Sequence, residues 1–326
     1  MKAVVYTLYG PPDVLQLQEV ASPTPSDNQV LIKVHAAAAN PLDWHFMRGT
    51  PFFVRLMAGL RKPKVTRLGV DLAGEVEAVG RNVTQFKPGD EVFGTGRGAF
   101  AEYVCASEEK LALKPTNSSF EQAASLPVAA ITALQGLRDK GCIQPGQKVL
   151  IDGASGGVGT FAIQIAKFFG AEVTAVCSTR NVDTARSIGA DHVLDYTKQD
   201  FSQSGQRYDL ILAANAYHSI LDYRRALTPT GIYVMAGGGA AQILQAMFLG
   251  PLLSLFGSKK MRIVRAKITQ KDLLLLNNLL ESKKVIPVID RQYPLNDTAE
   301  ALRYLGQGHA QGKVVITIEQ SGTPHR

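Results

Sequence analysis

A glycine-rich segment in the middle of the chain constrains the fold more than any other feature. Residues 153–159 read Gly-Ala-Ser-Gly-Gly-Val-Gly, directly after the apolar segment 148–152 and before the helix-like segment 160–167. Glycines at a strand-to-helix turn let the backbone approach a pyrophosphate, which the free N–H groups and dipole of the helix N-terminus attract. The alternative is a glycine turn that serves packing alone. The order of strand, turn and helix favours a dinucleotide site formed by Gly153, Ser155, Gly156, Gly157, Val158 and Gly159.

Short apolar strands alternate with helical segments between about residues 121 and 265, a pattern typical of a parallel sheet with crossover helices. We predict strands at 148–152, 172–177, 192–194, 208–212 and 231–235, which make most of a doubly wound Rossmann sheet in an α/β protein. The first 120 residues are strand-like and rich in turns, and residues 313–318 return to that texture. We therefore expect a nucleotide-binding domain, 123–265, inserted into a β-rich domain of residues 1–122 and 266–326.

The end of the second predicted strand indicates which dinucleotide binds. Enzymes that use NAD place a carboxylate there, on the ribose 2′-hydroxyl. Residues 177–181 read Cys-Ser-Thr-Arg-Asn and contain none. Ser178 and Thr179 can donate hydrogen bonds to a 2′-phosphate and Arg180 can neutralise it, so the sequence favours NADP(H). Tyr196, after the third strand, is either a further donor to this phosphate or a core tyrosine.

The charge balance admits an anionic partner without choosing one. The 326 residues include 35 Lys and Arg against 28 Asp and Glu, a formal charge of +7. Two short basic clusters, within 61–67 and 259–267, lack interleaved aromatic residues, so we interpret them as solvated surface and expect no nucleic acid. The apolar segment 241–256 is interpreted as a buried or pocket-lining helix pair; the alternatives are an oligomer contact or a membrane-surface contact.

The cysteines and the N-terminal segment indicate in which cellular compartment the protein is expected. Cys105, Cys142 and Cys177 form no C-x-x-C pair, so they predict neither a disulfide framework nor a thiolate zinc cluster. Residues 1–6 read as a strand rather than a leader sequence. We expect a cytoplasmic protein.

Several further motifs extend over nearly the whole chain. They are Asn40-Pro-Leu-Asp-Trp44, Gly69-Val-Asp-Leu-Ala-Gly-Glu-Val76, Phe86-Lys-Pro-Gly-Asp-Glu-Val92 and Gly308-His-Ala-Gln-Gly-Lys-Val314. With the glycine motif, they resemble the medium-chain dehydrogenase/reductase superfamily, and within it the zinc-independent quinone oxidoreductase branch, near the plant envelope-type homologues. The resemblance implies a GroES-like catalytic domain, a homodimer, and NADPH-dependent hydride transfer to quinones or to the C=C bond of α,β-unsaturated carbonyls.

The departures from the zinc-containing relatives concern the metal. Where those relatives carry a cysteine ligand this chain has the Asn40 segment, and where they carry Gly-His-Glu it has residues 69–71, Gly-Val-Asp. Because Zn²⁺ needs three or four converging donors, we predict no metal. Without a Lewis acid the expected acceptors are already activated, namely quinones and enones. Two alternatives stay open: a low-turnover NADPH sensor or RNA-binding protein, and a zinc-free alcohol dehydrogenase.

The resemblance also implies roles for individual residues. Asn40 would lie beside the nicotinamide and the substrate, the alternative being an Asn–Pro turn. Asp43 would orient Asn40 or a water, or else serve as a helix N-cap or buried structural carboxylate. Lys313 would lie close to the cofactor, or else be an ordinary surface lysine. The other implied residues are Thr132, Gly237 and Gly238 near the nicotinamide, and Trp44 and His45 in the substrate pocket.

Overall fold

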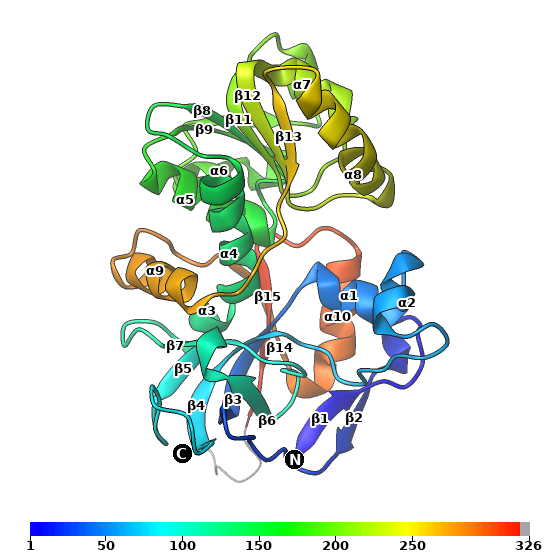
Figure 1. The fold of residues 1–326 in the computed structure, drawn as a ribbon, viewed down its shortest axis with the longest axis vertical. Helices are drawn as coiled ribbons and strands as arrows, with labels where there is room; N and C mark the ends of the chain where they lie inside the picture. The colour runs from blue at the N-terminus through cyan, green and yellow to red at the C-terminus, as the bar shows by residue number, and fades with distance from the viewer. Residues whose placement is uncertain (320–326) are drawn as a thin grey trace. The chain divides into compact units, whose positions relative to one another are not determined.

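The protein is described here by a computed structural model covering residues 1–319, which divide into two compact units (Figure 1). Unit 1 comprises Met1–Val128, Ile268–Ser282 and the described residues from Ile289 onward. Unit 2 comprises Ala129–Lys267 and Lys283–Val288. Each unit is built around its own sheet.

Unit 2 contains a six-stranded parallel sheet with the strand order β10-β9-β8-β11-β12-β13. The strands are β8 (Lys148–Asp152), β9 (Glu172–Cys177), β10 (His192–Asp195), β11 (Tyr208–Ala213), β12 (Leu227–Met235) and β13 (Lys260–Ile263). The chain runs outward from β8 in one direction and from β11 in the other, so the doubly wound prediction is confirmed. Strand β13 was not predicted, because Lys-Met-Arg-Ile lacks an apolar run.

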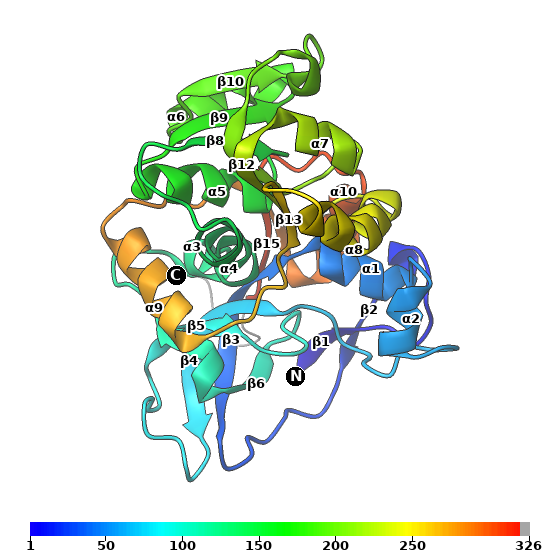
Figure 2. The same cartoon turned by 45° about the horizontal axis from the view of Figure 1, so that its top comes forward.

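Helices cover both faces of this sheet (Figures 1 and 2). Helices α5 (Gly157–Phe168) and α6 (Val182–Ser187) lie on one face, and α7 (Ile220–Ala226) and α8 (Ala240–Leu255) lie on the other. Helix α5 is buried continuously from Gly159 to Ala166. Helix α4 (Pro127–Gln135) precedes the first strand of the sheet. The carboxyl ends of the parallel strands therefore form one edge of unit 2, where loops and helix N-termini begin.

Unit 1 contains a seven-stranded sheet ordered β14-β15-β3-β4-β5-β7, with β6 paired to β3. Its strands are β3 (Gln29–Ala39), β4 (Asp71–Val79), β5 (Glu91–Thr95), β6 (Tyr103–Ser107), β7 (Leu111–Leu113), β14 (Ile289–Pro294) and β15 (Lys313–Thr317). Strands β1 (Lys2–Val5) and β2 (Gln16–Glu19) form a separate antiparallel pair. As predicted, the last strand joins the N-terminal part of the chain: Val314 of β15 lies opposite Ala39 of β3.

The helices of unit 1 surround this sheet. They are α1 (Pro41–Arg48), α2 (Phe53–Ala58), α3 (Phe120–Ala124), α9 (Gln270–Glu281) and α10 (Thr298–Gly306). The core side chains come from both the N-terminal strands and the C-terminal return, for example Ile32, Leu302 and Ile316. Burial of these side chains therefore holds the two distant parts of the chain together.

The prediction of a buried helix pair at 241–256 is wrong. The segment forms one helix, α8, with Pro251 inside it, and only Ala246 and Gly250 are buried. Phe248 is 67% exposed and Leu255 74% exposed. A helix that is apolar on all sides is usually buried, but α8 packs mainly against the edge strand β13 and against α7. Within residues 1–319, no helix is both long enough and apolar enough to cross a bilayer.

Candidate active site

The six predicted glycine-motif residues form one loop and the first turn of α5. Gly153 has φ of 76°, and a Cβ there would lie 2.8 Å from the Asn215 backbone nitrogen. A Cβ on Gly159 would lie 2.2 Å from the Gly153 carbonyl oxygen. Packing therefore requires glycine at both positions, because neither side chain could fit.

Gly156 is different, because nothing in the protein crowds it. It is the N-cap of α5, and a Cβ there would meet only the Gly153 carbonyl oxygen, at 3.7 Å. Glycine at this position leaves free space in front of the helix N-terminus, whose first N–H groups have no partner within the helix. The cradle fits the pyrophosphate of a dinucleotide, and Ser155, Gly157 and Val158 complete it.

The three residues predicted to recognise a 2′-phosphate follow β9, but their hydroxyls are not equally available. Asn181 Nδ2 donates to Ser178 Oγ at 3.0 Å, which leaves the Ser178 proton for a ligand. The Thr179 hydroxyl donates to Asp195 Oδ2 at 2.6 Å. Because that proton is already used, Thr179 cannot donate it to a phosphate in this arrangement. Ser178 and Arg180 remain the better candidates.

Asp195 is a carboxylate that the sequence analysis missed. It ends β10, opposite Cys177 at the end of β9. The hydrogen bond from Thr179 is the main cause that lowers the pKa of Asp195 to about 2, so the group is ionised at neutral pH. The signal was present in the sequence, because parallel neighbours place their carboxyl ends side by side.

The remaining predicted residues of unit 2 lie in three places. Tyr196 follows β10 with its side chain 62% exposed, which rules out the alternative of a core tyrosine. Thr132 is buried in α4. Gly237 and Gly238 follow β12, and the Gly237 N–H donates to the Ala213 carbonyl of β11. Because β8, β11 and β12 are parallel, these glycines share the sheet edge of the glycine loop.

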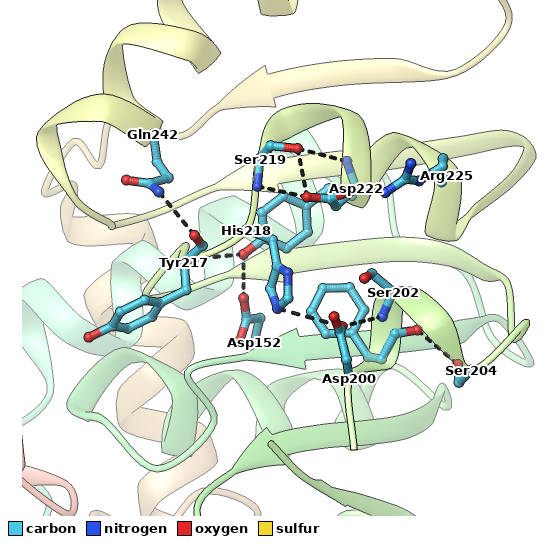
Figure 3. A network of polar contacts seen from close by, with 12 residues as sticks. Asp152, Asp200, Ser202, Ser204, Tyr217, His218, Ser219, Asp222, Arg225 and Gln242 are labelled. Atoms are coloured by element: carbon cyan, nitrogen blue, oxygen red, sulfur yellow. Dashed lines mark hydrogen bonds and ion pairs between the residues drawn. The ribbon is translucent and has the colours of Figure 1, made fainter. Parts of the chain in front are cut away.

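A buried polar network supports the strand that carries the loop (Figure 3). Asp152, the last residue of β8, accepts a hydrogen bond from the Tyr223 hydroxyl, which in turn accepts one from the Tyr217 N–H at 3.2 Å. Nearby, His218 Nε2 lies 3.8 Å from an Asp200 carboxylate oxygen. Burial raises the pKa of Asp152 to about 6. The network ties the end of β8 to the start of α7, and so fixes where the loop begins.

Unit 1 contains a compact polar cluster that we call the Asn40 cluster: Asn40, Asp43, Asp71 and Lys313, each at most 4% exposed. Lys313 Nζ donates to Asn40 Oδ1 at 2.8 Å and lies 3.3 Å from Asp71 Oδ2. Asn40 Nδ2 donates to the same Asp71 oxygen at 3.0 Å. The Asn40 amide is therefore held in one orientation by a cation on its oxygen and a carboxylate on its nitrogen.

The Asp43 carboxylate joins the Asn40 cluster by accepting hydrogen bonds from backbone N–H groups. Asn40 is the N-cap of α1, and its N–H donates to Asp43 Oδ2 at 2.9 Å, while the Gly69 N–H donates to Asp43 Oδ1 at 3.0 Å. Burial is the main cause that raises the pKa of Asp43 to about 6. This geometry corresponds to the buried structural carboxylate that the sequence left open.

Two points of the Asn40 cluster go beyond the sequence analysis. The alternative of a surface lysine at position 313 is wrong, because the side chain is buried in an ion pair. Asp71 was noticed only as part of a motif, yet it joins Lys313, Asn40 and the Val128 N–H, which donates to its other oxygen at 2.9 Å. The signal was an acidic residue at the start of an otherwise apolar segment.

A cavity of about 630 Å³ lies beside this cluster in unit 1. Most of the side chains that line it are apolar, and basic groups join them; the residues include Leu42, Phe46, Met57, Val65, Leu68, Val70, Lys64, Arg67, Arg97 and Lys110. Asp43 and Tyr6 also contribute to the wall. Burial raises the pKa of Tyr6 to about 12, so its phenol keeps its proton at neutral pH. Sequence reasoning did not single out Tyr6.

The two residues predicted to line a substrate pocket are not among those that line this cavity. Trp44 packs against Gly306, where a Cβ would lie 2.4 Å from its ring, and the Arg48 guanidinium lies over that ring at 5.1 Å. His45 Nδ1 donates to the Thr50 carbonyl at 2.8 Å. Their neighbours Leu42 and Phe46 face the cavity instead.

The donor set of the Asn40 cluster does not fit zinc. An amide, two carboxylates that accept hydrogen bonds and an ammonium group fill the space, and Lys313 already supplies the positive charge. Across residues 1–319, no three His, Cys, Asp or Glu side chains are grouped so that they could hold a metal ion.

Comparison with known proteins agrees with both units. Residues 26–116 match the alcohol dehydrogenase GroES-like domain, and residues 188–316 match the zinc-binding dehydrogenase family. The chain is 38% identical to 2-methylene-furan-3-one reductase of Solanum lycopersicum, over 97% of this chain and 79% of that protein. It belongs to the medium-chain dehydrogenase/reductase superfamily.

Two further relatives extend this result. This dehydrogenase/reductase chain is 36% identical to the chloroplastic NADPH-dependent alkenal/one oxidoreductase of Arabidopsis thaliana, over 97% of this chain and 79% of that protein. The solved structure of the quinone oxidoreductase from Coxiella burnetii superposes with a TM-score of 0.86 at 31% identity, covering 98% of this chain and 99% of that one. The predicted superfamily and fold are confirmed.

Proposed function

We propose that this dehydrogenase/reductase is an NADPH-dependent enzyme that reduces quinones or the C=C bond of α,β-unsaturated carbonyls, and that it does so without zinc. The observation that carries the proposal is the largely apolar cavity of unit 1, which lies beside the buried Asn40 cluster and has the Tyr6 phenol in its wall. The names of the relatives, a furanone reductase, an alkenal/one oxidoreductase and a quinone oxidoreductase, support it.

The proposed cofactor residues are those of unit 2. Loop residues 153–159 would hold the pyrophosphate, and Ser178 and Arg180 the 2′-phosphate, with Tyr196 as an exposed neighbour. Thr132, Gly237 and Gly238 would hold the nicotinamide end. When bound, NADPH supplies a hydride.

The proposed substrate residues are those of unit 1. Reduction of an enone places negative charge on its carbonyl oxygen, and a fixed donor there stabilises the enolate. We assign this donor to the Tyr6 hydroxyl, because Tyr6 lies in the wall of the cavity. Asn40, whose amide is held by Lys313, Asp71 and the Ala38 carbonyl, would act as a positioning residue behind the cavity wall, and so would Asp43, which lines the cavity. Water supplies the proton that the α-carbon finally requires.

Two further proposals concern the protein's setting. We propose a homodimer, as the resemblance implies, and its test is the molar mass in solution. A cytoplasmic location stays a prediction, and the curated Arabidopsis relative is named as chloroplastic. Fractionation of source cells decides the location.

The catalytic test follows NADPH consumption with a panel of enones, quinones and simple alcohols, with and without chelator. We expect turnover of enones or quinones that chelator leaves unchanged. Tyr6→Phe should lower kcat about ten-fold, while the Kd for NADPH stays the same. No turnover with any enone or quinone, or activity lost to chelator, would contradict the proposal.

The cofactor test uses Arg180→Ala with Arg186→Ala as the control, because Arg186 lies on α6 with an exposed side chain, 3.9 Å from the Asp183 carboxylate. Arg180→Ala should weaken NADPH binding about ten-fold and NADH binding much less. Asp195→Asn should strengthen NADPH binding about three-fold, since it removes a negative charge beside Thr179. Equal loss of NADPH affinity in Arg180→Ala and in the control would refute the assignment of Arg180.

A further inference from the structure

A second cavity, in unit 2, brings three basic side chains together. Its volume is about 490 Å³, and it is lined by Arg207, Arg224 and Lys259 with Leu227, Pro229, Gly257 and Ser258. Arg207 directly precedes β11 and Lys259 directly precedes β13, while Leu227 begins β12. Because these strands are parallel, their amino ends share one edge. The glycine loop follows the carboxyl end of β8, so this basic cavity lies at the opposite edge from the dinucleotide site.

The three cations have no counterion. Within residues 1–319, none of them forms an ion pair with a carboxylate. Lys259 Nζ donates to the Arg224 carbonyl oxygen at 2.8 Å, and Arg207 donates to the carbonyls of Gly205 and Gln206. The Arg224 Nε is buried and has no hydrogen-bond partner among residues 1–319. The next residue, Arg225, is by contrast paired with Asp222.

The three basic side chains of this cavity raise the free energy of the folded protein when no anion is bound. Burial, together with the charges of Arg224 and Arg207, lowers the pKa of Lys259. A buried N–H that bonds to nothing also costs free energy, because it has lost its water. An anion in the cavity would offset the mutual repulsion of the three cations, which contributes to the lowered pKa of Lys259.

We infer that this basic cavity binds a soluble phosphorylated small molecule with at least two negative charges, at a site separate from the dinucleotide. Guanidinium groups and ammonium groups are the side chains that bind phosphate oxygens most strongly. The volume lies within the range of small-molecule pockets. Leu227 and Pro229 offer apolar surface to the rest of such a ligand.

Calorimetric titration with inorganic pyrophosphate tests this inference on the full chain saturated with NADPH, so that the dinucleotide site is already filled. We expect one pyrophosphate per chain. Arg207→Gln and Lys259→Gln should each weaken binding about ten-fold, because each removes one charge-assisted contact. Arg207 is exposed and bonds only to neighbouring carbonyls, so its loss should leave the fold intact.

The matched control is Arg225→Gln, which changes the adjacent arginine outside the cavity and should leave the Kd for pyrophosphate unchanged. No binding by the NADPH-saturated protein, or an equal loss in Arg225→Gln, would overturn the inference. A second arm uses vesicles of phosphatidic acid and phosphatidylcholine, with which the protein should not sediment. Sedimentation that Arg207→Gln abolishes would assign the phosphate to a lipid headgroup and overturn a soluble ligand.

Discussion

Asp71 in unit 1 and Asp152 in unit 2 are both buried carboxylates at a strand end, but they have different partners. Asp71 begins β4 and lies 3.3 Å from the Lys313 ammonium group. Asp152 ends β8 and accepts a hydrogen bond from the neutral phenol of Tyr223. Unit 1 thus compensates its carboxylates with a buried ammonium group, whereas the groups that donate hydrogen bonds to Asp152 in unit 2 are a phenol and the Gly153 N–H. Burial raises the pKa of both groups, and the ammonium group counteracts that rise at Asp71.

This difference between the partners of Asp71 and Asp152 predicts how the stability of each unit changes when the partner is removed. A buried ion pair contributes little net stability, but removal of one member leaves an uncompensated charge. A carboxylate with a neutral partner can instead take up a proton as the pH falls. Unit 1 should therefore be the more sensitive to loss of its cation, while both units respond to pH, because burial also raises the pKa of Asp43 in unit 1 to about 6.

The largest expected effect is that of Lys313→Met. The substitution leaves Asp71 and Asp43 buried without a cation, and we expect it to lower the free energy of unfolding by about 3–5 kcal/mol. Urea unfolding at neutral pH measures this loss. Lys313→Met combined with Asp71→Asn should recover more than half of it, because the uncompensated charge is removed. A single-variant cost below about 1 kcal/mol would show that the cation is not needed.

The second prediction concerns Asp152→Asn and the pH dependence of stability. The pKa of Asp152 is about 6 in the folded protein and 3.8 as its ordinary value, so the folded state holds the proton more tightly. Its contribution to stability is therefore fully present below about pH 4 and is lost as the pH rises through about 6, by at most about 3 kcal/mol. Asp152→Asn should make this decline between acidic and neutral pH smaller, as measured by urea unfolding at several pH values, while the contribution of Asp43 remains.

Asp222, in the same unit, provides a control whose contribution to stability should change with pH in the opposite direction. A hydrogen bond from Ser219 is the main cause that lowers the pKa of Asp222, so its contribution is present above the ordinary pKa and is lost as the pH falls. Asp222→Asn should weaken the protein more at neutral than at acidic pH. If Asp152→Asn followed the same trend, the assignment of a retained proton to Asp152 would fail.

The smallest expected effect is that of Tyr223→Phe, which removes the neutral donor to Asp152. We expect a cost of about 2–3 kcal/mol above pH 6, where the donor faces a charged carboxylate, and about 1 kcal/mol below it. Thermal and urea unfolding at two pH values measure the difference. Tyr208→Phe is the control, because it breaks a hydrogen bond of 2.7 Å to the neutral Gln206 amide and should cost the same at both pH values. Equal costs for Tyr223→Phe at both pH values would contradict the comparison.

The parts of the fold that the sequence predicted are those with a local signature. Strands β8 and β9 begin and end at the predicted residues, because each is a short apolar run bounded by polar or glycine residues. No bounds were predicted for strand β3, whose second half, Ala36–Ala39, is buried on both faces and shows no alternation. Helix α8 was assigned to the interior because composition alone cannot say how many sides of a helix have neighbours.

The candidate site also has some features that a local sequence pattern predicts and others that depend on tertiary packing. The glycine loop was predictable because Gly153 and Gly159 are required by the turn itself. The Asp195–Thr179 bond depends on which strand lies beside β9, and so it escaped an analysis that considered one strand at a time. Tyr6 was not singled out because its interest lies in a pKa raised by burial, which only the packed structure produces.

The sequence by itself determined the nucleotide-binding architecture, the preference for a dinucleotide with a 2′-phosphate and the membership of a dehydrogenase/reductase family. Backbone requirements of glycines and the periodicity of apolar residues act over a few positions, so they can be followed along the chain. Only the tertiary structure decided which charges meet. Lys313 reaches Asp71 across 242 positions, and Arg207 and Lys259 lie in one cavity because two parallel strands begin at the same edge. Such pairings depend on strand order and register, which no local pattern specifies.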